Sequence, residues 1–225
     1  MSEKKPPAWR PSGLIQKAFE QAVERHKDCV RKGTDIPYIC HLLAVSALVI
    51  ENGGDETQAA AALLHDVIED TPTTYAEVET ATSTAVADIV WACTSKQFDP
   101  NKDKSRTGEQ KRLESIAAKR KYLEHLRGET SEDPSLLVAL ADKVHNSETC
   151  VNEYPSSLVE QKEYWKKFNV GYEDQLNWYT QLLEQFGTKG TISERLIIRL
   201  RQSIHILFYQ PQQNRVGDDD SIEIQ

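Results

Sequence analysis

Residues 59–70 read AAAALLHDVIED, an apolar helical run that ends in His65 and Asp66 and continues into two more acids. The His-Asp dipeptide places a neutral nitrogen ligand beside an anionic oxygen ligand. Glu69 and Asp70 follow three and four residues after Asp66, so on a helix they share its face. Burying four ionisable groups within six positions is costly unless a metal ion or a substrate compensates them. The stretch therefore predicts a buried helix that carries a functional site.

The helical pattern extends in both directions from this run. Toward the N-terminus, apolar residues recur at intervals of four, which predicts a helix over 12–30 that is closed by Gly33. Pro37 is suited to open a second helix over 37–50, and the almost wholly apolar middle of that helix should be buried on most sides. Its first turns carry His41.

Capping signals divide the rest of the chain. Asp55 with Gln58 predicts the start of the helix that runs to Asp70, and Thr74 with Glu77 predicts the next helix start. The remaining predicted helices are one or two over 74–94, one over 110–126, one that begins at 134, and three over 158–168, 172–186 and 193–209.

No stretch alternates with a period of two for long enough to predict a sheet, and there is no internal repeat. The predicted fold class is therefore all-α, a helical bundle with additional C-terminal helices. In the helix that begins at 134, an apolar run over 136–141 precedes Asp142 and carries this acid into the interior. Trp and Tyr residues over 158–186 are expected to pack in the core rather than form a binding stripe.

Composition limits the class of protein. The 225 residues are 39% hydrophobic and 28% charged, which suits one globular domain with a substantial core. No apolar run approaches the roughly 20 residues of a membrane span, and the N-terminus lacks an apolar signal-peptide core. The four cysteines are scattered without a CxxC pair, so we expect reduced, mostly buried thiols. We expect a cytoplasmic protein without a membrane partner.

The net charge of −8 argues against nucleic acid as a partner. The basic pair Arg31-Lys32 nevertheless offers a local patch for a phosphate-rich small molecule. The expected organisation has four segments, which are a flexible N-terminus over 1–11, a main domain over 12–186, a helical extension over 187–209 and a disordered acidic tail over 210–225. The helix over 193–209 is apolar enough either to pack on the domain or to form a homo-oligomer.

Three segments of the chain offer metal ligands, namely His41, the pair His65-Asp66, and Asp142. If they converge, two imidazole nitrogens and two carboxylate oxygens leave open positions on an octahedral ion. Such a set suits Mn²⁺, Fe²⁺ or Mg²⁺ better than a structural zinc. A structural zinc usually has all four coordination positions filled by protein ligands, with cysteine among them. The open positions can hold a phosphate oxygen and a water molecule whose pKa the metal lowers.

Glu69 and Asp70 are then placed to orient or deprotonate that water, or to protonate the leaving group. Each ligand on its own has an ordinary explanation. A single histidine such as His41 is most often a satisfied core residue, and a single buried acid such as Asp142 most often hydrogen-bonds a neighbouring cap. The combination in three buried segments favours a metal site.

These residues resemble the H…HD…D signature of the HD superfamily of metal-dependent phosphohydrolases, whose fold is an HD-domain helical bundle. Three stretches further resemble the hydrolase domain of RelA/SpoT proteins and of the stand-alone small alarmone hydrolases. They are Arg31-Lys32-Gly33 with PYICH at 37–41, AALLHDVIEDT at 61–71, and LADKVHN at 140–146. The resemblance covers about 12–152.

The resemblance implies a metal centre that holds Mn²⁺ and is made by His41, His65, Asp66 and Asp142. It implies two catalytic acids that handle the hydrolytic water, Glu69 and Asp70. It implies four contacts to a phosphorylated purine nucleotide, made by Arg31, Lys32, Lys143 and Asn146. The implied reaction is hydrolysis of (p)ppGpp, the alarmone of the stringent response, to GDP or GTP and pyrophosphate.

Two alternatives stay open at this point. A close enzymatic one is removal of the 2′-phosphate from NADPH, or hydrolysis of another nucleotide. One of a different class is a nucleotide-binding regulatory module without turnover. Degenerate domains of this kind normally lack a metal ligand or the acid pair, whereas every one of these residues is present in the chain. We therefore expect an enzyme.

Overall fold

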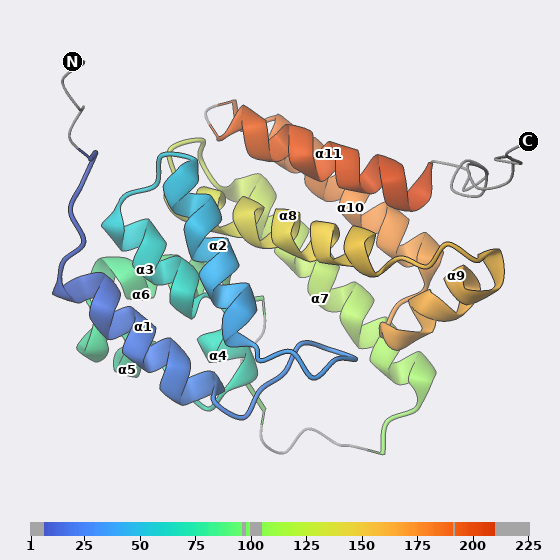
Figure 1. Cartoon of the computed structure of the whole chain (residues 1–225), viewed down its shortest axis with the longest axis horizontal. Helices are drawn as coiled ribbons and strands as arrows, with labels where there is room; N and C mark the ends of the chain where they lie inside the picture. The colour runs from blue at the N-terminus through green and yellow to red at the C-terminus, as the bar shows by residue number, and fades with distance from the viewer. Residues whose placement is uncertain (1–6, 96–97, 100–104, 191, 210–225) are drawn as a thin grey trace, which may run out of the picture.

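A computed structural model of the chain describes residues 7–95, 98–99, 105–190 and 192–209 (Figure 1). Within these ranges every regular element is a helix, and extended chain pairs only in one isolated bridge between Val30 and Pro37. The all-α prediction is confirmed. In chain order the helices are α1 (Gly13–His26), α2 (Ile39–Glu51), α3 (Glu56–Leu64), α4 (Val67–Asp70), α5 (Tyr75–Ala81), α6 (Thr84–Cys93), α7 (Gly108–Gly128), α8 (Ser135–Glu153), α9 (Leu158–Tyr164), the 3₁₀ helix η1 (Trp165–Lys167), α10 (Tyr172–Gly187) and α11 (Glu194–Phe208).

Helix α3, which contains the apolar run, lies at the centre of the N-terminal half. Every residue over 59–64 is buried, because four consecutive alanines and two leucines allow neighbours to pack on all sides of the helix. These neighbours are α1, α2, α6 and α8. The predicted capping box of Asp55 and Gln58 starts the helix, and that of Thr74 and Glu77 starts α5. Both capping predictions are confirmed.

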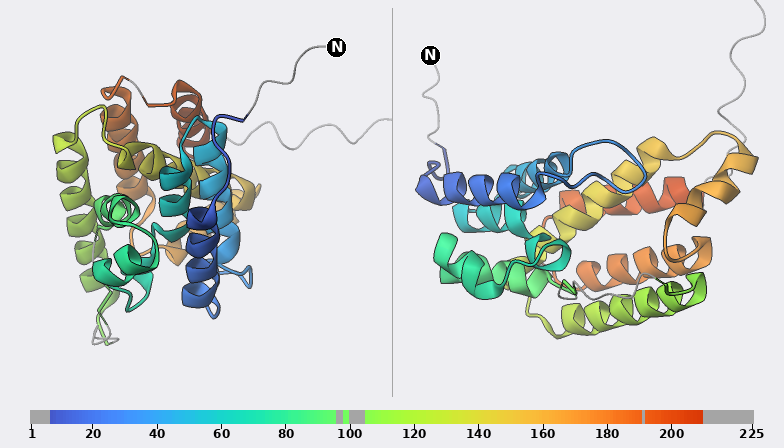
Figure 2. Two further views of the ribbon diagram at one scale, coloured as in Figure 1. Left: turned by 90° about the vertical axis from the view of Figure 1, so that its left-hand side faces the viewer. Right: turned by 90° about the horizontal axis from the view of Figure 1, so that it is seen from below.

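Helix α8 joins the two halves of the molecule. It packs against α2, α3 and α6 on one side and against α11 on the other. Helix α11 packs on α10 and α10 on α7, which lies on the opposite side of the molecule from α1 (Figure 2). One hydrophobic core contains side chains from α1 through α11. The buried side of α11, with Leu196, Leu200 and Leu207, is therefore covered by the chain itself.

Helix α1 ends at His26, four residues earlier than predicted. The chain then forms a loop in which the Tyr38 N–H donates to the carbonyl oxygen of Cys29 at 2.9 Å. Gly33 turns this loop with a φ of 79°, a conformation that glycine adopts without steric cost. The prediction of a longer helix was wrong. The apolar spacing continues past His26, but the backbone groups of the following residues form the hydrogen bonds of the loop instead of helical ones. The loop places Arg31 beside the site described below.

The predicted helix from Asp55 to Asp70 is also interrupted. It divides into α3 and α4 at His65 and Asp66, where the backbone of Asp66 has φ −97° and ψ −3°. These angles lie between the helical and extended regions, in an area where site residues are common. The N–H groups of Glu69 and Asp70 then donate to the Asp66 carbonyl oxygen at 3.1 and 2.9 Å. Apolar spacing does not report such a local change of direction, so the prediction of one continuous helix was wrong.

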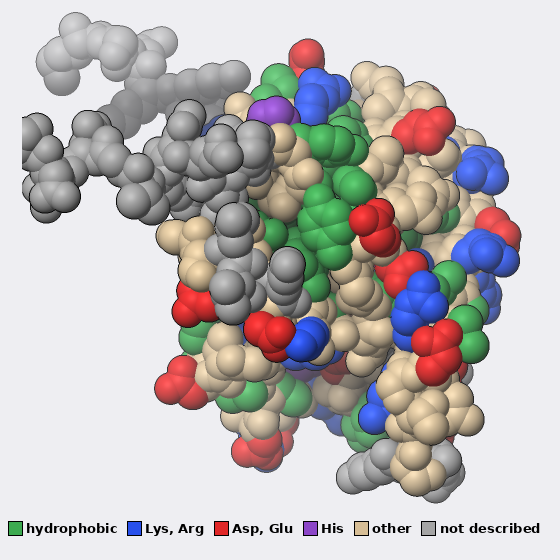
Figure 3. Space-filling model, turned by 90° about the vertical axis from the view of Figure 1, so that its right-hand side faces the viewer, with side chains coloured by type: hydrophobic (Ala, Val, Ile, Leu, Met, Phe, Trp, Pro, Cys, Tyr) green, Lys and Arg blue, Asp and Glu red, His purple; other side chains and the backbone are tan. Residues whose placement is uncertain are grey.

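Aromatic side chains hold together the end of the molecule formed by α9, η1 and the adjoining ends of α10 and α11. Trp165 stacks on Phe208 with ring centroids 5.2 Å apart, and Tyr164 meets Trp165 edge to face at 5.2 Å. Figure 3 shows the surface at this end, where hydrophobic side chains lie amid charged ones. Tyr164, Trp165, Trp178 and Tyr179 are all buried, as their predicted packing role requires, and Trp178 and Tyr179 also line the cavity described below.

None of the helices in the described ranges is long and apolar enough to cross a membrane. Trp9 donates its indole N–H to the Gly54 carbonyl oxygen at 3.0 Å, which attaches the chain ahead of α1 to the fold. Three segments lie outside the described residues, namely 1–6 of the expected flexible N-terminus, the expected acidic tail (210–225), and half of the polar segment between α6 and α7 (96–97 and 100–104).

Lys189 is a buried lysine that closes the C-terminal end of α7. Its Nζ donates to the carbonyl oxygens of Arg127 and Glu129 at 3.2 and 2.5 Å. These carbonyls are left without helical partners, and the helix dipole favours a cation there. We expect Lys189→Met to lower the free energy of unfolding by about 2 kcal/mol, as measured in urea. The same change at the exposed Lys121 should cost less than about 0.5 kcal/mol, and equal costs would contradict this role.

Candidate metal centre

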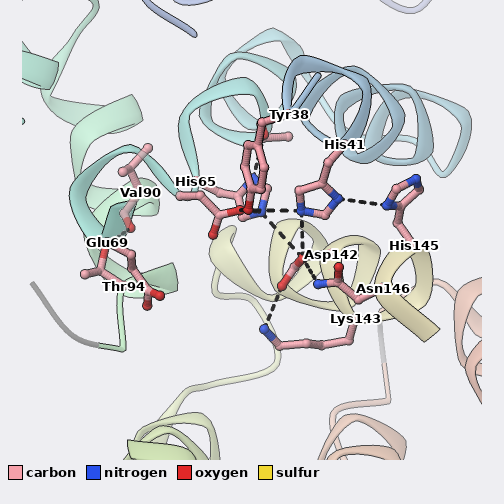
Figure 4. A network of polar contacts seen from close by, with 12 residues as sticks. Tyr38, His41, His65, Glu69, Val90, Thr94, Asp142, Lys143, His145 and Asn146 are labelled. Atoms are coloured by element: carbon pink, nitrogen blue, oxygen red, sulfur yellow. Dashed lines mark hydrogen bonds and ion pairs between the residues drawn. The ribbon is translucent and has the colours of Figure 1, made fainter. Parts of the chain in front are cut away.

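Three parts of the fold bring the four predicted metal ligands together. His41 lies in the first turn of α2, His65 and Asp66 lie where α3 gives way to α4, and Asp142 lies in the middle of α8. His41 is fully buried, and His65 and Asp142 are 3% and 6% exposed. Figure 4 shows His41, His65 and Asp142 pointing toward one another from their separate helices.

The four ligand atoms form a ring in which nitrogen and oxygen alternate. Nε2 of His41 lies 3.4 Å from Oδ2 of Asp66 and 3.2 Å from Oδ1 of Asp142. Nε2 of His65 lies 3.0 and 3.5 Å from the same two oxygens. Two ligands about 2.1 Å from one ion and at right angles to each other are roughly 3 Å apart. Each neighbouring nitrogen–oxygen pair therefore has the spacing of two ligands on one ion, and the ligand atoms of His41, His65 and Asp66 all lie within 4.8 Å of one another.

The Nε2 atoms of His41 and His65 are buried and have no hydrogen-bond partner among the residues that the structure describes. The other nitrogen of each imidazole is engaged. Nδ1 of His65 lies 2.8 Å from the carbonyl oxygen of Ala62, and Nδ1 of His41 lies 2.8 Å from Nδ1 of His145. Because a carbonyl oxygen only accepts, Nδ1 of His65 carries a proton, and Nε2 is the nitrogen of His65 that can bind a metal. Buried unpaired nitrogens are costly, so this donor set fits a metal ion.

Both carboxylates of the ring are charged despite their burial. Burial raises the pKa of Asp66 and of Asp142, but His65 beside Asp66 and Lys143 beside Asp142, with the nearby imidazole of His41, hold both pKa values well below the usual range. Burial likewise lowers the pKa of His65, yet the two carboxylates raise it well above its ordinary value. The ring thus favours an added positive charge, which a divalent cation supplies.

Side chains outside the ring hold each carboxylate in place. Tyr38 donates its hydroxyl to Oδ2 of Asp66 at 2.7 Å. Burial and the charge of Asp66 raise the pKa of Tyr38, so this hydroxyl stays protonated. Lys143 donates to Oδ2 of Asp142 at 2.6 Å, and Asn146 donates to Oδ1 at 2.5 Å. Lys143 and Asn146, expected as substrate contacts, therefore also fix the orientation of Asp142.

A cavity of about 580 Å³ opens beside the ring, a volume suited to a small-molecule ligand. His41, fully buried, does not reach it. Every other predicted site residue lines it, which means Arg31, Lys32, His65, Asp66, Glu69, Asp70, Asp142, Lys143 and Asn146.

The segment that follows α6 holds Glu69 at the cavity wall. Oε1 of Glu69 accepts hydrogen bonds from the backbone N–H of Ser95 at 2.5 Å and from its hydroxyl at 2.7 Å. These bonds orient a carboxylate that is only partly buried, while Asp70 beside it is exposed. The two acids can therefore reach solvent or a ligand in the cavity, next to the ring of metal ligands.

Arg31 connects the loop after α1 to the centre. Its guanidinium donates to Oδ1 of Asn146 at 2.8 Å and lies 5.6 Å from the centre of the Tyr38 ring. Since Tyr38 and Asn146 each hold a carboxylate of the ring, Arg31 is braced by the same side chains that orient Asp66 and Asp142. A group bound by Arg31 would consequently lie next to the metal centre.

Cationic and aromatic side chains also lie close together in the lining of the cavity. Lys32 and Lys167 lie 5.7 and 5.2 Å from the ring centre of Phe168, and Lys119 lies 4.2 Å from that of Trp178. All five residues line the cavity. Lysines attract anionic groups, and aromatic faces can stack against a flat base. The cavity lining therefore suits a ligand that combines phosphates with an aromatic ring.

The sequence did not predict these further residues at the site, namely Tyr38, His145, Ser95, Lys119, Lys167, Phe168 and Trp178. Tyr38 and His145 each lie three residues from a predicted metal ligand, and this spacing was a usable signal. Ser95, Lys119 and Lys167 come from distant parts of the chain. No local pattern links them to the metal ligands.

Comparison with known proteins places these residues in a family context. Residues 18–167 match the HD domain family. A guanosine-3′,5′-bis(diphosphate) 3′-pyrophosphohydrolase of Aquifex aeolicus is 38% identical over 136 residues, which are 60% of this chain and 17% of that protein. The Xenopus tropicalis enzyme of the same name, MESH1, is 30% identical over 185 residues, 81% of this chain and 88% of that protein. The GTP pyrophosphokinase rsh of Brucella melitensis is 34% identical over 60% of this chain and 17% of its own length.

Two solved structures share the fold. One is that of a metazoan SpoT ortholog described as hydrolysing ppGpp, with a TM-score of 0.61 and 23% identity over 88% of this chain and 97% of that one. The other is a Listeria monocytogenes protein, with a TM-score of 0.55 and 23% identity over 77% and 99% of the two chains. The chain thus spans nearly the whole of the short relatives and about a sixth of the long ones.

Proposed function

Because the chain belongs to the HD domain family, we propose that it is a metal-dependent phosphohydrolase that removes pyrophosphate from (p)ppGpp and leaves GDP or GTP. One observation supports this most strongly. Two buried imidazole nitrogens without a hydrogen-bond partner in the described part of the chain meet two carboxylates at a cavity that also carries Glu69 and Asp70. The names of the Aquifex and Xenopus relatives point to this substrate.

In this proposal His41, His65, Asp66 and Asp142 hold Mn²⁺, with Fe²⁺ or Mg²⁺ as alternatives. Imidazole and carboxylate ligands with open positions suit these ions. When bound, such an ion makes water more acidic and offsets the negative charge of the phosphate. Tyr38, Lys143 and Asn146 keep the two carboxylates aimed at the ring.

Glu69, held by Ser95, accepts a proton from the attacking water. The water oxygen forms a bond to the phosphorus that is linked to the 3′ oxygen, and the bond between that phosphorus and the 3′ oxygen breaks. Asp70 orients the water and relays a proton from solvent to the leaving oxygen. The products are GDP or GTP, each with a free 3′ hydroxyl, and pyrophosphate. The remaining phosphates bind to the cationic side chains of Arg31, Lys32, Lys119 and Lys167. The base stacks on the aromatic ring of Phe168 or Trp178.

A substrate panel tests the proposal. It comprises ppGpp, pppGpp, NADPH, GTP, a deoxynucleoside triphosphate and a cyclic nucleotide, each with Mn²⁺, Mg²⁺ or EDTA. We expect pyrophosphate release from ppGpp with Mn²⁺ and none with EDTA. Protein that spares ppGpp but dephosphorylates NADPH would overturn the substrate and support the NADPH 2′-phosphatase alternative. Nucleotide binding without turnover of any compound would support a regulatory module instead.

Arg31→Ala is expected to raise KM for ppGpp about tenfold with little change in kcat. A charge-assisted hydrogen bond to a bound phosphate is worth about 1.5 kcal/mol or more, and 1.4 kcal/mol corresponds to a factor of ten. Steady-state kinetics measure the effect, and Mn²⁺ binding should be unchanged. The matched control is Arg195→Ala, an exposed arginine of α11. A fall in kcat at constant KM would contradict a role in substrate binding.

A further inference from the structure

His145 is a second histidine of α8 that contacts the metal centre without lying in the ring. It follows Asp142 by three residues, so both side chains leave α8 on neighbouring positions of one face. Its Nδ1 lies 2.8 Å from Nδ1 of His41, with ring centroids 4.8 Å apart and planes tilted by 41°. Figure 4 shows this contact on the side of the His41 ring that faces away from His65.

A hydrogen bond between two imidazole nitrogens requires one proton and one lone pair. If His145 donates, Nδ1 of neutral His41 must be the acceptor and Nε2 of His41 must carry the proton. Nε2 would then have no lone pair for a metal, and its proton would point at Asp66 and Asp142 without meeting hydrogen-bond geometry. If His145 accepts, the proton lies on Nδ1 of His41 and Nε2 is free to bind.

We propose that His145 is a positioning residue, which accepts the Nδ1 proton of His41 and thereby keeps the Nε2 lone pair of His41 directed at the metal. Most metal-bound histidines donate this proton to a carboxylate or a carbonyl oxygen, as His65 does to Ala62. An imidazole partner differs because it can either donate or accept. His145 can accept only as the neutral tautomer with its proton on Nε2.

The inference rests on the metal role proposed above for His41, and the two can fail separately. If the wild-type protein binds no Mn²⁺, the metal site itself is overturned. If the wild-type protein binds Mn²⁺ and loss of the His145 acceptor leaves that binding unchanged, only the inference is overturned.

Two variants of His145 distinguish its role as a hydrogen-bond acceptor from its contribution to side-chain packing. His145→Asn keeps an acceptor, because the amide oxygen takes a place close to that of Nδ1, whereas His145→Leu fills similar space without one. The free Mn²⁺ signal in electron paramagnetic resonance measures binding of the metal alone. We expect a 10- to 100-fold weaker Kd in His145→Leu and a change of less than about threefold in His145→Asn. His205→Leu, at an exposed histidine of α11, is the matched control and should bind as the wild type does.

Thermal unfolding in EDTA shows whether each variant folds. Equal Mn²⁺ affinity in folded His145→Leu and the wild type would overturn the proposal, as would equal losses in the Asn and Leu variants. Should the Leu variant fail to fold, the wild-type protein still decides the matter. Two-bond ¹H–¹⁵N correlation spectra with diamagnetic Zn²⁺ should show the proton on Nδ1 of His41 and on Nε2 of His145. The reverse tautomers would overturn the proposal.

Discussion

Asp66→Ala is expected to lower kcat/KM for ppGpp by about 10³ or more, because it removes one of the four ring ligands and the acceptor of the Tyr38 hydroxyl. Metal ions contribute several kcal/mol to the stabilisation of charge in such reactions, and about 4 kcal/mol corresponds to a factor of 10³. Rates of pyrophosphate release measure this loss of activity. Asp66→Ala should also abolish tight binding of Mn²⁺, which a titration with Mn²⁺ measures.

The matched control is Asp28→Ala, which removes an exposed carboxylate outside the cavity. It should leave both the rate and Mn²⁺ binding within about twofold of the wild type, since surface substitutions change energies by about 0.5 kcal/mol or less. Full turnover in Asp66→Ala would contradict the proposed centre. A regulatory module would instead show nucleotide binding in the wild type and no rate to lose.

Glu69→Gln is expected to lower kcat by 10²- to 10⁴-fold while Mn²⁺ binding stays intact. General acid–base catalysis contributes about this factor. The amide oxygen of glutamine can still accept from the N–H and hydroxyl of Ser95, so the side chain should keep its position. It cannot take a proton from water. Single-turnover rates at saturating Mn²⁺ measure the loss in the chemical step.

Ser95→Ala provides a graded comparison for Glu69. It deletes the hydroxyl bond but keeps the backbone N–H bond to Oε1, so we expect a fall in kcat of less than about tenfold. If Glu69→Gln kept its kcat within threefold, Glu69 would not be the base. If it lost Mn²⁺ as Asp66→Ala does, Glu69 would be a metal ligand.

Much of this molecule can be predicted from local sequence. The all-α architecture, the capping boxes of α3 and α5 and the burial of Asp142 follow from apolar spacing, from side-chain oxygens near helix starts and from the apolar run ahead of that acid. Membership of the HD domain family follows from His41, the pair His65-Asp66 and Asp142 at their spacing. These signals work because each is carried by residues close in sequence or by a residue type that is costly to bury without a partner.

Only the tertiary structure decided the rest. The early end of α1 and the break at Asp66 depend on backbone bonds that compete with the helical ones and that apolar spacing does not reveal. The bond of Ser95 to Glu69 and the placing of Lys119 beside Trp178 join segments tens of residues apart. Chain folding alone brings such groups within a few ångströms. The sequence by itself therefore determined which residues can bind a metal, and the packing of α2, α3 and α8 determined where their lone pairs point.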